Sequence, residues 1–293
     1  MKAMSRIEQS LAAAISTGEE PGCPPRLAGA IRHAVFPGGA RIRPQLCLAV
    51  AHACGDDDPE LAEGAAASIE LLHCASLVHD DLPCFDDAST RRGRASVHFA
   101  FGESLAVLAG DALIVLAFQT VARAAGRSPQ RLAPLLETIS RGVGMPFGIV
   151  AGQAWESEPR VSLADYQRAK TGALFAAACM AGAQAAGADA QAWRGLGEWL
   201  GEAYQAADDI RDVAGDPRVL GKPVGRDAAL LRPSAASELG LEGAIQHFDA
   251  LVLRAIDAIP PCPGAAGLRA LVRMESERLV PKTMAEELAR PVA

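Results

Sequence analysis

The sequence predicts an all-α protein, and three observations support this prediction. Apolar residues recur at spacings of three and four along nearly the whole chain, as they do on the buried faces of helices. The alternation of apolar and polar residues that marks strands is not sustained anywhere. Half of the 293 residues are hydrophobic and only 4% are aromatic, and the dominant apolar residues include Ala and Leu, which are strong helix formers.

Proline positions and apolar patterns place the individual helices. Pro44 suits the first turn of a helix. Pro217 should end the helix before it, and Pro83 should end or kink the helix before it. Stretches 105–122 and 171–187 are apolar around most of the helix circumference, which is typical of helices in the middle of a bundle. The predicted helices cover residues 5–16, 25–35, 43–55, 60–81, 102–124, 129–155, 163–187, 190–214, 236–258 and 265–289.

No linker, repeat or low-complexity segment divides the chain, so we expect one domain over residues 1–293. The one long irregular stretch, 215–234, is rich in glycine and proline. A loop of that length inside a compact helical domain is usually functional or disordered. Its basic residues Lys222 and Arg232 favour an active-site flap.

The composition excludes several classes of protein. The formal charge of −7, from 28 basic and 35 acidic residues, argues against a nucleic-acid-binding protein, which carries a basic face. Seven cysteines without a CxxC pair favour reduced thiols and a cytoplasmic location. The N-terminal residues lack the apolar core of a signal peptide. No uninterrupted apolar stretch reaches the roughly 20 residues of a membrane span, so no transmembrane segment is expected.

Asp208, Asp209 and Asp212 form an acidic cluster near the end of a predicted helix. Asp208 and Asp212 are four residues apart on one helix face, about 5–6 Å from each other, where like charges repel. Burying them without a counter-charge would be strongly unfavourable. A divalent cation removes this penalty, and carboxylate and phosphate oxygens are the ligands that Mg²⁺ prefers. The cluster therefore predicts a magnesium–phosphate site.

The other acidic cluster runs from Asp80 and Asp81, on a predicted helix, to Asp86. A proline breaks the helix between them, so the chain must turn back for Asp80 and Asp86 to share one set of ions. Arg91 and Arg92 follow, and guanidinium groups bind phosphate oxygens in bidentate fashion. A single motif of this kind is equally well explained as a solvated helix end. Two motifs, one with an arginine pair beside it, favour diphosphate binding.

These residues carry a resemblance to the trans-type isoprenyl (polyprenyl) diphosphate synthases that extends over nearly the whole chain. The closest resemblance is to the geranylgeranyl diphosphate synthases of bacterial carotenoid and bacteriochlorophyll pathways. The matching motifs, in the family's order, are Phe36–Pro44, Asp80–Asp87 with Arg91-Arg92-Gly93, Leu108–Leu113, Gly152-Gln153, Lys170–Leu174, Asp208–Asp212, and Gly221-Lys222 with Gly225 and Asp227.

The resemblance implies a helical bundle of the isoprenoid synthase type around a central cavity, a homodimer and three Mg²⁺ ions. It implies a transferase that condenses isopentenyl diphosphate with dimethylallyl, geranyl or farnesyl diphosphate and releases diphosphate. The metal ligands would be Asp80, Asp86 and Asp208, with supporting or water-mediated roles for Asp81, Asp209 and Asp212.

The resemblance also implies how each substrate is held. The allylic diphosphate would contact the cations Arg91, Lys170 and Lys222, while Arg232 keeps the charge of a second lysine that the family has in the late loop. Isopentenyl diphosphate would be held by Arg43, His73 and Arg92. The side chains that face the reacting carbons would be Thr171 and Gln205.

Besides Arg232, two further positions depart from the family's pattern. The family usually has Lys where this chain has Ala40, so one cation for isopentenyl diphosphate is missing, and Arg41 or another residue is expected to compensate. The acid that follows Gly152-Gln153 is commonly Asp in the family, and Glu156 takes its place here. Neither departure touches the aspartates, so we expect an active enzyme.

The family resemblance also bears on product length. The residues one turn before the first aspartate form the floor of the pocket for the growing chain, and here they are Ala75 and Ser76. Five helical residues rise about 7.5 Å, so a large side chain at position 75 would block the tail soon after its diphosphate. Farnesyl-forming relatives usually have an aromatic residue near this point. Its absence here, with Leu72 and Ile69 lying deeper, favours a C20 product.

Three alternatives stay open from the sequence. A farnesyl diphosphate synthase would stop at fifteen carbons. A terpene cyclase shares the helical cavity and the magnesium chemistry, but it typically has an Asn/Ser/Glu pattern in place of the aspartates of Asp208–Asp212. A non-catalytic partner subunit of a true synthase is suggested only by Ala40.

Overall fold

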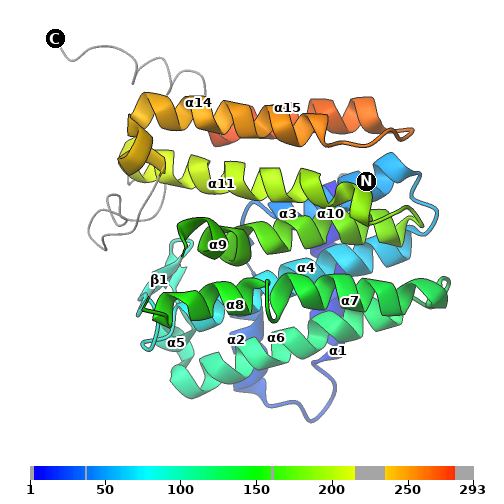
Figure 1. Ribbon diagram of the computed structural model, residues 1–293. Helices are drawn as coiled ribbons and strands as arrows, with labels where there is room; N and C mark the ends of the chain where they lie inside the picture. Colours follow the sequence, from blue (N-terminus) through cyan, green and yellow to red (C-terminus); the bar gives the residue numbers. More distant parts are fainter. Residues whose placement is uncertain (1–2, 37, 160–161, 215–234, 281–293) are drawn as a thin grey trace.

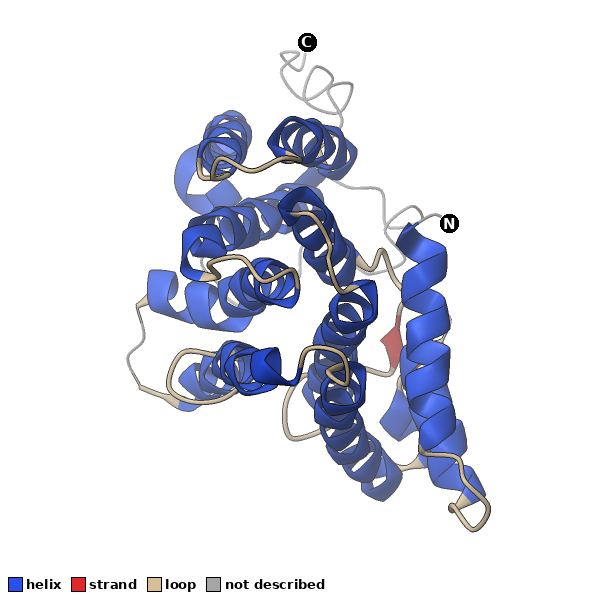
Figure 2. Ribbon diagram, turned by 90° about the vertical axis from the view of Figure 1, so that its right-hand side faces the viewer, coloured by secondary structure: helices blue, strands red, loops and turns tan. Residues whose placement is uncertain are grey.

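The structure, a computed structural model, describes residues 3–36, 38–159, 162–214 and 235–280. Nearly all of the secondary structure in this part is helical, so the predicted all-α class is confirmed. The longer helices run side by side with nearly parallel axes (Figure 1). Figure 2 shows many of them end-on, with α1 (Ala3–Thr17), the helix that begins near the N-terminus, lying across one side.

The first half of the chain continues with further helices and a small antiparallel ribbon. These elements are α2 (Pro25–Val35), α3 (Ile42–Cys54), α4 (Pro59–Asp80), β1 (Thr90–Arg91), β2 (Arg94–Ala95), α5 (Val97–Phe101) and α6 (Glu103–Ala124). Asp58 caps α4, because its side chain accepts a hydrogen bond from the Leu61 amide at 3.4 Å. Pro59 occupies the first helical position, where proline loses no helical hydrogen bond.

The regular secondary structure in the described residues of the second half is entirely helical. Its α-helices are α7 (Leu132–Val143), α8 (Ile149–Ala154), α9 (Leu163–Gln167), α10 (Ala173–Ala185), α11 (Arg194–Ala214), α14 (Ala235–Asp257) and α15 (Ala265–Leu279). Short 3₁₀ turns accompany them at η1 (Pro129–Arg131), η2 (Trp155–Ser157) and η4 (Gln191–Trp193). A π-helical turn, η3 (Arg168–Gly172), joins α9 to α10.

The prediction of one helix over 129–155 was wrong. The helix breaks between α7 and α8, where Gly144 and Gly148 have extended backbones and Pro146 lacks the amide hydrogen that an α-helix needs. The helix predicted over 163–187 is continuous only if the π-helical turn η3 is included. Residues 281–289 of the last predicted helix lie outside the described residues.

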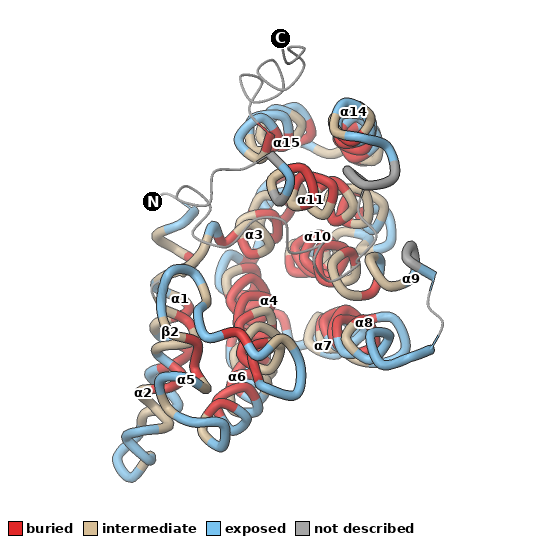
Figure 3. Tube along the Cα trace, turned by 90° about the vertical axis from the view of Figure 1, so that its left-hand side faces the viewer, coloured by how far each residue is buried: buried red, intermediate tan, exposed pale blue. Residues whose placement is uncertain are grey.

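Two buried clusters of apolar side chains meet at α3 and α10. One cluster joins these helices to α1, α2, α4, α6 and α7, and the other joins them to α11, α14 and α15. Gly182 of α10 lies so close to α3 that a Cβ there would stand 2.2 Å from the Cys47 carbonyl oxygen. Stretch 171–187 therefore lies in the middle of the bundle, as predicted, and most of α10 is buried (Figure 3).

The prediction that stretch 105–122 lies in the middle of the bundle was wrong. One face of α6 packs against α4, but Val107, Leu108 and Val115 are 43%, 50% and 56% exposed. By length and composition alone, α4 and α6 are both apolar enough to cross a membrane, a test that core helices of soluble proteins also pass. The most apolar stretch of α4 is 78% buried and that of α6 only 39%, so α6 presents an apolar face that the described residues leave uncovered.

Arg41 ties three helices together from a buried position at the start of α3. Its backbone is left-handed (φ 51°) and only 2% of the residue is exposed. The guanidinium donates hydrogen bonds to Glu8 of α1 at 2.9 Å, to Glu70 of α4 at 2.6 Å and to the Val35 carbonyl oxygen at 2.8 Å. Two carboxylates thus offset the burial of one cation, and the Arg41 guanidinium points into the core.

We predict that Glu70→Gln lowers the free energy of unfolding by about 3 kcal/mol, because it leaves the buried Arg41 with one carboxylate instead of two. Glu198→Gln is the control, since it removes a more exposed ion pair with Arg194 on α11 that is worth less than about 1 kcal/mol. Urea unfolding followed by circular dichroism measures both variants. Equal midpoints for the two would show that the buried pair does not stabilise the fold.

Candidate active site

The chain turns back on itself directly after α4. The Asp86 amide donates to the Asp80 carbonyl oxygen at 3.0 Å, and the Ala88 amide donates to the Asp81 carbonyl oxygen at 3.1 Å. Burial raises the pKa of the Asp80 carboxyl, and the charge of Asp86, which the turn brings near, raises it further. The predicted return of the chain after Pro83 is confirmed.

The buried carboxylate of Asp81 forms an ion pair with the partly exposed Arg91 beside this turn. Only 2% of Asp81 is exposed, and its Oδ1 accepts hydrogen bonds from Nε of Arg91 at 2.9 Å and from Nη2. Burial raises the pKa of Asp81, and the hydrogen bonds from Arg91 oppose that rise. The Asp81 carboxylate therefore orients Arg91, whose guanidinium lies next to Asp80.

Asp80 presents an unsatisfied oxygen at the end of α4. Its Oδ1 is buried and makes no hydrogen bond within the described part of the chain. Two cations stand near the carboxylate without donating to it, since Lys170 Nζ lies 3.7 Å from Oδ1 and Arg91 Nη2 lies 3.9 Å from Oδ2. A buried oxygen of this kind calls for a further partner, and a hard cation is the type that a carboxylate suits best.

Lys170 is held by a carboxylate and a tyrosine. Its Nζ donates to Oε1 of Glu156 in η2 and lies 5.6 Å from the centroid of the Tyr166 ring. The Tyr166 hydroxyl donates to the same Glu156 oxygen at 2.6 Å. Burial opposes the charge on Lys170, but Asp80, Tyr166 and Glu156 outweigh it and raise the pKa of the lysine. The ammonium is therefore charged at neutral pH.

The π-helical turn η3 directs two neighbouring side chains to different partners, and π-turns are frequent at functional sites. Lys170 reaches Glu156, while Thr171 Oγ1 donates to Gln205 Oε1 at 3.1 Å. Gln205 Nε2 in turn donates to Oδ1 of Asp209 at 2.9 Å. This series of hydrogen bonds connects η3 to the acidic motif of α11.

The acidic motif of α11 holds one buried and one more open carboxylate. Asp209 is 2% exposed, whereas the Asp208 side chain is 40% exposed and lies 3.3 Å from Nη2 of Arg211. Asp212 belongs to the same helix, but its side chain lies outside the described residues. The predicted site residues Lys222 and Arg232, and the predicted flap 215–234, also lie outside them.

Arg43, His73 and Arg92 gather near the first turn of α3, two turns before the end of α4. Arg43 Nη1 lies 3.4 Å from His73 Nε2, and the Arg43 guanidinium stacks 4.5 Å above the Phe175 ring. Arg92 packs against the backbone of Gly39, where a Cβ would stand 2.7 Å from its Cζ. Burial lowers the pKa of His73 well below its ordinary value, and the charges of Arg43 and Arg92 lower it further. The imidazole is therefore neutral at neutral pH.

Arg43 carries the clearest sign of a missing partner in this group. Its Nε is buried and makes no hydrogen bond among the described residues. Arg41, by contrast, uses its guanidinium on Glu8, Glu70 and Val35. The expectation that Arg41 compensates for Ala40 was therefore wrong, because its left-handed backbone turns the side chain into the core instead of toward Arg43.

The residues predicted to form the floor of a chain-binding pocket lie one turn before Asp80 on α4. Ala75 is 1% exposed, and the Ser76 hydroxyl donates to the His73 carbonyl oxygen at 2.8 Å. Leu72 and Ile69, one and two turns deeper, are also buried. Along α4, the small side chains of Ala75 and Ser76 therefore lie nearer to Asp80 than the large side chains of Leu72 and Ile69.

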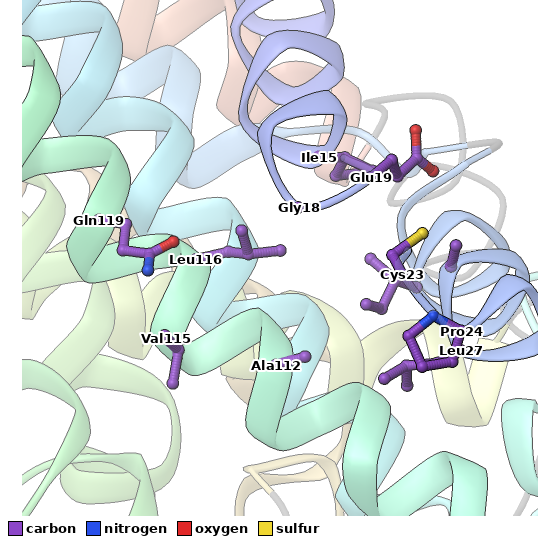
Figure 4. Close-up of a pocket in the computed structure, with 12 residues that line it drawn as sticks. Ile15, Gly18, Glu19, Cys23, Pro24, Leu27, Ala112, Val115, Leu116 and Gln119 are labelled. Carbon is purple, nitrogen blue, oxygen red and sulfur yellow. The ribbon is translucent and has the colours of Figure 1, made fainter. Parts of the chain in front are cut away.

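An apolar pocket of about 300 Å³ lies elsewhere, between the end of α1, the start of α2 and α6 (Figure 4). Leu27 and Cys23 border it on one side and Val115 and Leu116 on the other. None of the residues that line it is a predicted site residue. It adjoins the uncovered face of α6.

The two acidic motifs do not form a closed metal site by themselves. Among the described residues, no group of three or more His, Cys, Asp or Glu side chains is arranged to hold a metal ion. Mg²⁺ is usually bound through one or two carboxylates, with water and substrate phosphates in the remaining positions. Separate aspartates fit that pattern better than a structural metal cage.

Two residues of the site were not assigned from the sequence. Glu156 was expected only as the replacement of a family acid, and Tyr166 had no assignment. The available signal was the spacing of Tyr166 and Lys170, since residues four apart lie on one helix face. The position of Glu156 beside them depends on the packing of α8 against η3, where a Cβ at Gly152 would stand 2.4 Å from the Lys170 amide nitrogen.

Known proteins closely resemble this chain in sequence. A sequence model described as polyprenyl synthetase matches residues 24–255. The geranylgeranyl diphosphate synthase of Cereibacter sphaeroides is 53% identical over 280 residues, which cover 96% of this chain and 97% of that protein. The geranylgeranyl diphosphate synthase of Rhodobacter capsulatus is 48% identical over 275 residues, which cover 94% and 95%.

A solved structure shares the fold. The geranyltransferase of Helicobacter pylori, complexed with magnesium and isoprenyl diphosphate, matches with a TM-score of 0.78 at 27% identity and covers 95% of this chain and 98% of that chain. The predicted resemblance and the predicted isoprenoid synthase-type bundle are confirmed. On sequence and fold together, this chain belongs to the polyprenyl synthetase family.

Proposed function

We propose that this protein is a geranylgeranyl diphosphate synthase. It condenses isopentenyl diphosphate with a shorter allylic diphosphate, releases diphosphate and stops at twenty carbons. The observation that supports this most is that α4 carries two cationic neighbourhoods, one beside Asp80 and one beside His73, two turns earlier. Two diphosphate groups need two such neighbourhoods. Relatives that match nearly the whole chain are named geranylgeranyl diphosphate synthases.

Magnesium is the cofactor that these residues fit. The Asp80 oxygen without a hydrogen bond is a hard donor in a partly buried place, and a structural relative is described as complexed with magnesium. The expected ligands are Asp80, Asp86 and Asp208, with Asp81, Asp209 and Asp212 supporting them, and three ions are expected. When bound, Mg²⁺ supplies positive charge that stabilises the leaving diphosphate.

The protein's own cations act on the same developing charge. Lys170 and Arg91 bind the allylic diphosphate, so that negative charge is stabilised as the allylic C–O bond breaks. The double bond of isopentenyl diphosphate, held by the group around Arg43, attacks the allylic carbocation. Oxygen atoms of Thr171 and Gln205 face the cation. The attack forms the new C–C bond and leaves a tertiary carbocation, which loses a proton to the released diphosphate and so becomes the new double bond.

The site around Arg43 binds isopentenyl diphosphate without the family's lysine. Ala40 provides no charge and Arg41 is paired in the core, so Arg43 and Arg92 supply the positive charge there. Neutral His73 donates a hydrogen bond to the diphosphate. The unsatisfied Nε of Arg43 supports this assignment, because a phosphate oxygen would complete it.

We predict that the purified protein with Mg²⁺ converts farnesyl diphosphate and isopentenyl diphosphate into a C20 product, because the small residues Ala75 and Ser76 leave room for a fourth isoprene unit. Mass spectrometry of the dephosphorylated products measures this. A dominant C15 product from dimethylallyl diphosphate would instead indicate a farnesyl diphosphate synthase. A cyclic hydrocarbon from geranylgeranyl diphosphate alone would indicate a terpene cyclase, and no turnover would indicate a non-catalytic subunit.

With dimethylallyl and isopentenyl diphosphate as substrates, Ala75→Phe should shift the dominant product from C20 to C15. A benzyl side chain one turn before Asp80 fills the space that the tail needs after its third isoprene unit. Ala75→Ser is the control of near-native size and should keep the C20 product. Thermal melting of both variants checks the fold, since overpacking a buried site destabilises by about 1–3 kcal/mol. Unchanged C20 output from folded Ala75→Phe would show that another residue sets the floor.

The uncovered face of α6 is the expected interface of a homodimer. Leu108 and Val115 are about half exposed on the apolar helix α6. Exposed apolar patches of this kind mark protein interfaces. A second copy of the chain would cover both. The same proposal includes a cytoplasmic location, which the seven free cysteines favour. It also includes a single catalytic domain and the use of the product in carotenoid synthesis.

We predict that Leu108→Glu converts a dimer into a monomer, because a buried, unpaired carboxylate on each side opposes association. Met274→Glu is the control, since Met274 is 51% exposed on α15, far along the chain from α6. Light scattering coupled to size-exclusion chromatography gives the mass of each variant. A dimeric Leu108→Glu, or a monomeric wild type, would contradict the assignment of this interface.

A further inference from the structure

Lys170 is shared unequally between two carboxylates. Its Nζ donates a hydrogen bond to Glu156 Oε1, but it stays 3.7 Å from Asp80 Oδ1. That Asp80 oxygen makes no hydrogen bond to any of the described residues. A partly buried ammonium pairs with whichever carboxylate its surroundings favour, and here they favour Glu156.

We propose that Glu156 and Tyr166 are positioning residues that draw the Lys170 ammonium away from Asp80 and so leave the Asp80 Oδ1 oxygen open to a hard divalent cation. The inference rests on the proposed function and deepens it, because it concerns how the metal side of the same site is kept ready in the free enzyme.

Three separate elements build this arrangement. Glu156 lies in η2, Tyr166 in α9 and Lys170 in η3. The Glu156 carboxylate is fixed from both sides, since Oε1 accepts the Tyr166 hydroxyl at 2.6 Å and Oε2 accepts the side-chain amide of Gln153 at 3.5 Å. Tyr166 also places its ring near Lys170, so one tyrosine orients both members of the ion pair.

The length of the acidic side chain matters for this role. An aspartate at position 156 would end one methylene earlier, about 1.5 Å farther from Lys170. The Lys170 ammonium would then pair more readily with Asp80, the other carboxylate near it. A direct Lys170–Asp80 pair would occupy Oδ1, and a metal ion would have to displace the ammonium before it could bind.

Charge alone does not explain the preference for Glu156. Asp80 has Arg91 near its other oxygen and Asp86 beside it, and Asp81 is already paired with Arg91. Lys170 faces Asp80, Glu156 and Tyr166. The hydrogen bond that Tyr166 donates to Glu156 is a further difference between the two carboxylates that face Lys170, and a substitution can test it.

The test measures Mn²⁺ binding to the full-length protein without substrate, by electron paramagnetic resonance of the free ion. Glu156→Gln should weaken binding about tenfold, the effect expected from losing a hydrogen bond to a charged group. Tyr166→Phe keeps the ring and loses the hydroxyl, so it should weaken binding by a smaller factor. Glu158→Gln, the same change of charge on an exposed residue two positions away, should leave binding unchanged.

Removal of the lysine separates positioning from direct ligation. Lys170→Gln combined with Glu156→Gln should restore Mn²⁺ binding to the level of Lys170→Gln alone, because no ammonium remains to occupy Asp80. If Glu156→Gln weakens binding equally with and without Lys170, Glu156 is itself a metal ligand and the proposal is wrong. Wild-type protein that binds no Mn²⁺ at millimolar concentrations, or a Glu156→Gln variant that binds like wild type, would also overturn it.

The product assay keeps this inference distinct from the proposed function. A wild type that makes the C20 diphosphate, with Mn²⁺ binding unaffected by Glu156→Gln, would overturn the inference alone. A wild type that makes no prenyl diphosphate, but shows the expected pattern of Mn²⁺ binding, would overturn the proposed function alone.

Discussion

Two carboxylates that are buried along α4 and at its end are each paired with an arginine, and the site depends on this constraint. Glu70 pairs with Arg41 near the middle of the helix, and Asp81 pairs with Arg91 at its end. Because an unpaired charge in the interior is strongly destabilising, each pair also fixes the position of its partner's segment. The pairs therefore hold Arg41, at the start of α3, and Arg91, in β1, against α4. They do so while Asp80 and Arg43 each keep one unsatisfied atom for a ligand.

The helices behind the site make these positions rigid. α3 and α10 lie between two apolar clusters, so Arg43 at the start of α3 and Thr171 at the start of the α10 segment are anchored by packing on both sides. The π-helical turn η3 adds the local change of direction that separates Lys170 from Thr171. Packing thus sets the distance between Arg43 and Thr171, and the π-helical turn sets the directions in which Lys170 and Thr171 point.

The fold class and the acidic motifs could be predicted from the sequence, because helical periodicity and charge clusters are local properties. For the break between α7 and α8, the only signal in the sequence is Pro146. A proline inside an apolar run is compatible with a kinked helix as well as with a break. The uncovered face of α6 could not be predicted, because an apolar helix has the same pattern whether its own chain or a second copy covers it. Periodicity likewise gives no sign that Arg41 points inward, which depends on a left-handed residue. The contact of Glu156 with Lys170 depends on tertiary packing of α8 against η3, which residue spacing does not contain.

Diphosphate release from farnesyl and isopentenyl diphosphate, followed against Mg²⁺ concentration in wild type and Asp80→Asn, tests the role of the α4 carboxylate most directly. The structure predicts that diphosphate release requires Mg²⁺ and that its rate falls about 10³-fold in Asp80→Asn. The variant loses a carboxylate ligand of the metal ion at the place where negative charge develops on the leaving diphosphate. Release that persists in a chelator, or that is unchanged in a folded Asp80→Asn, would contradict the account.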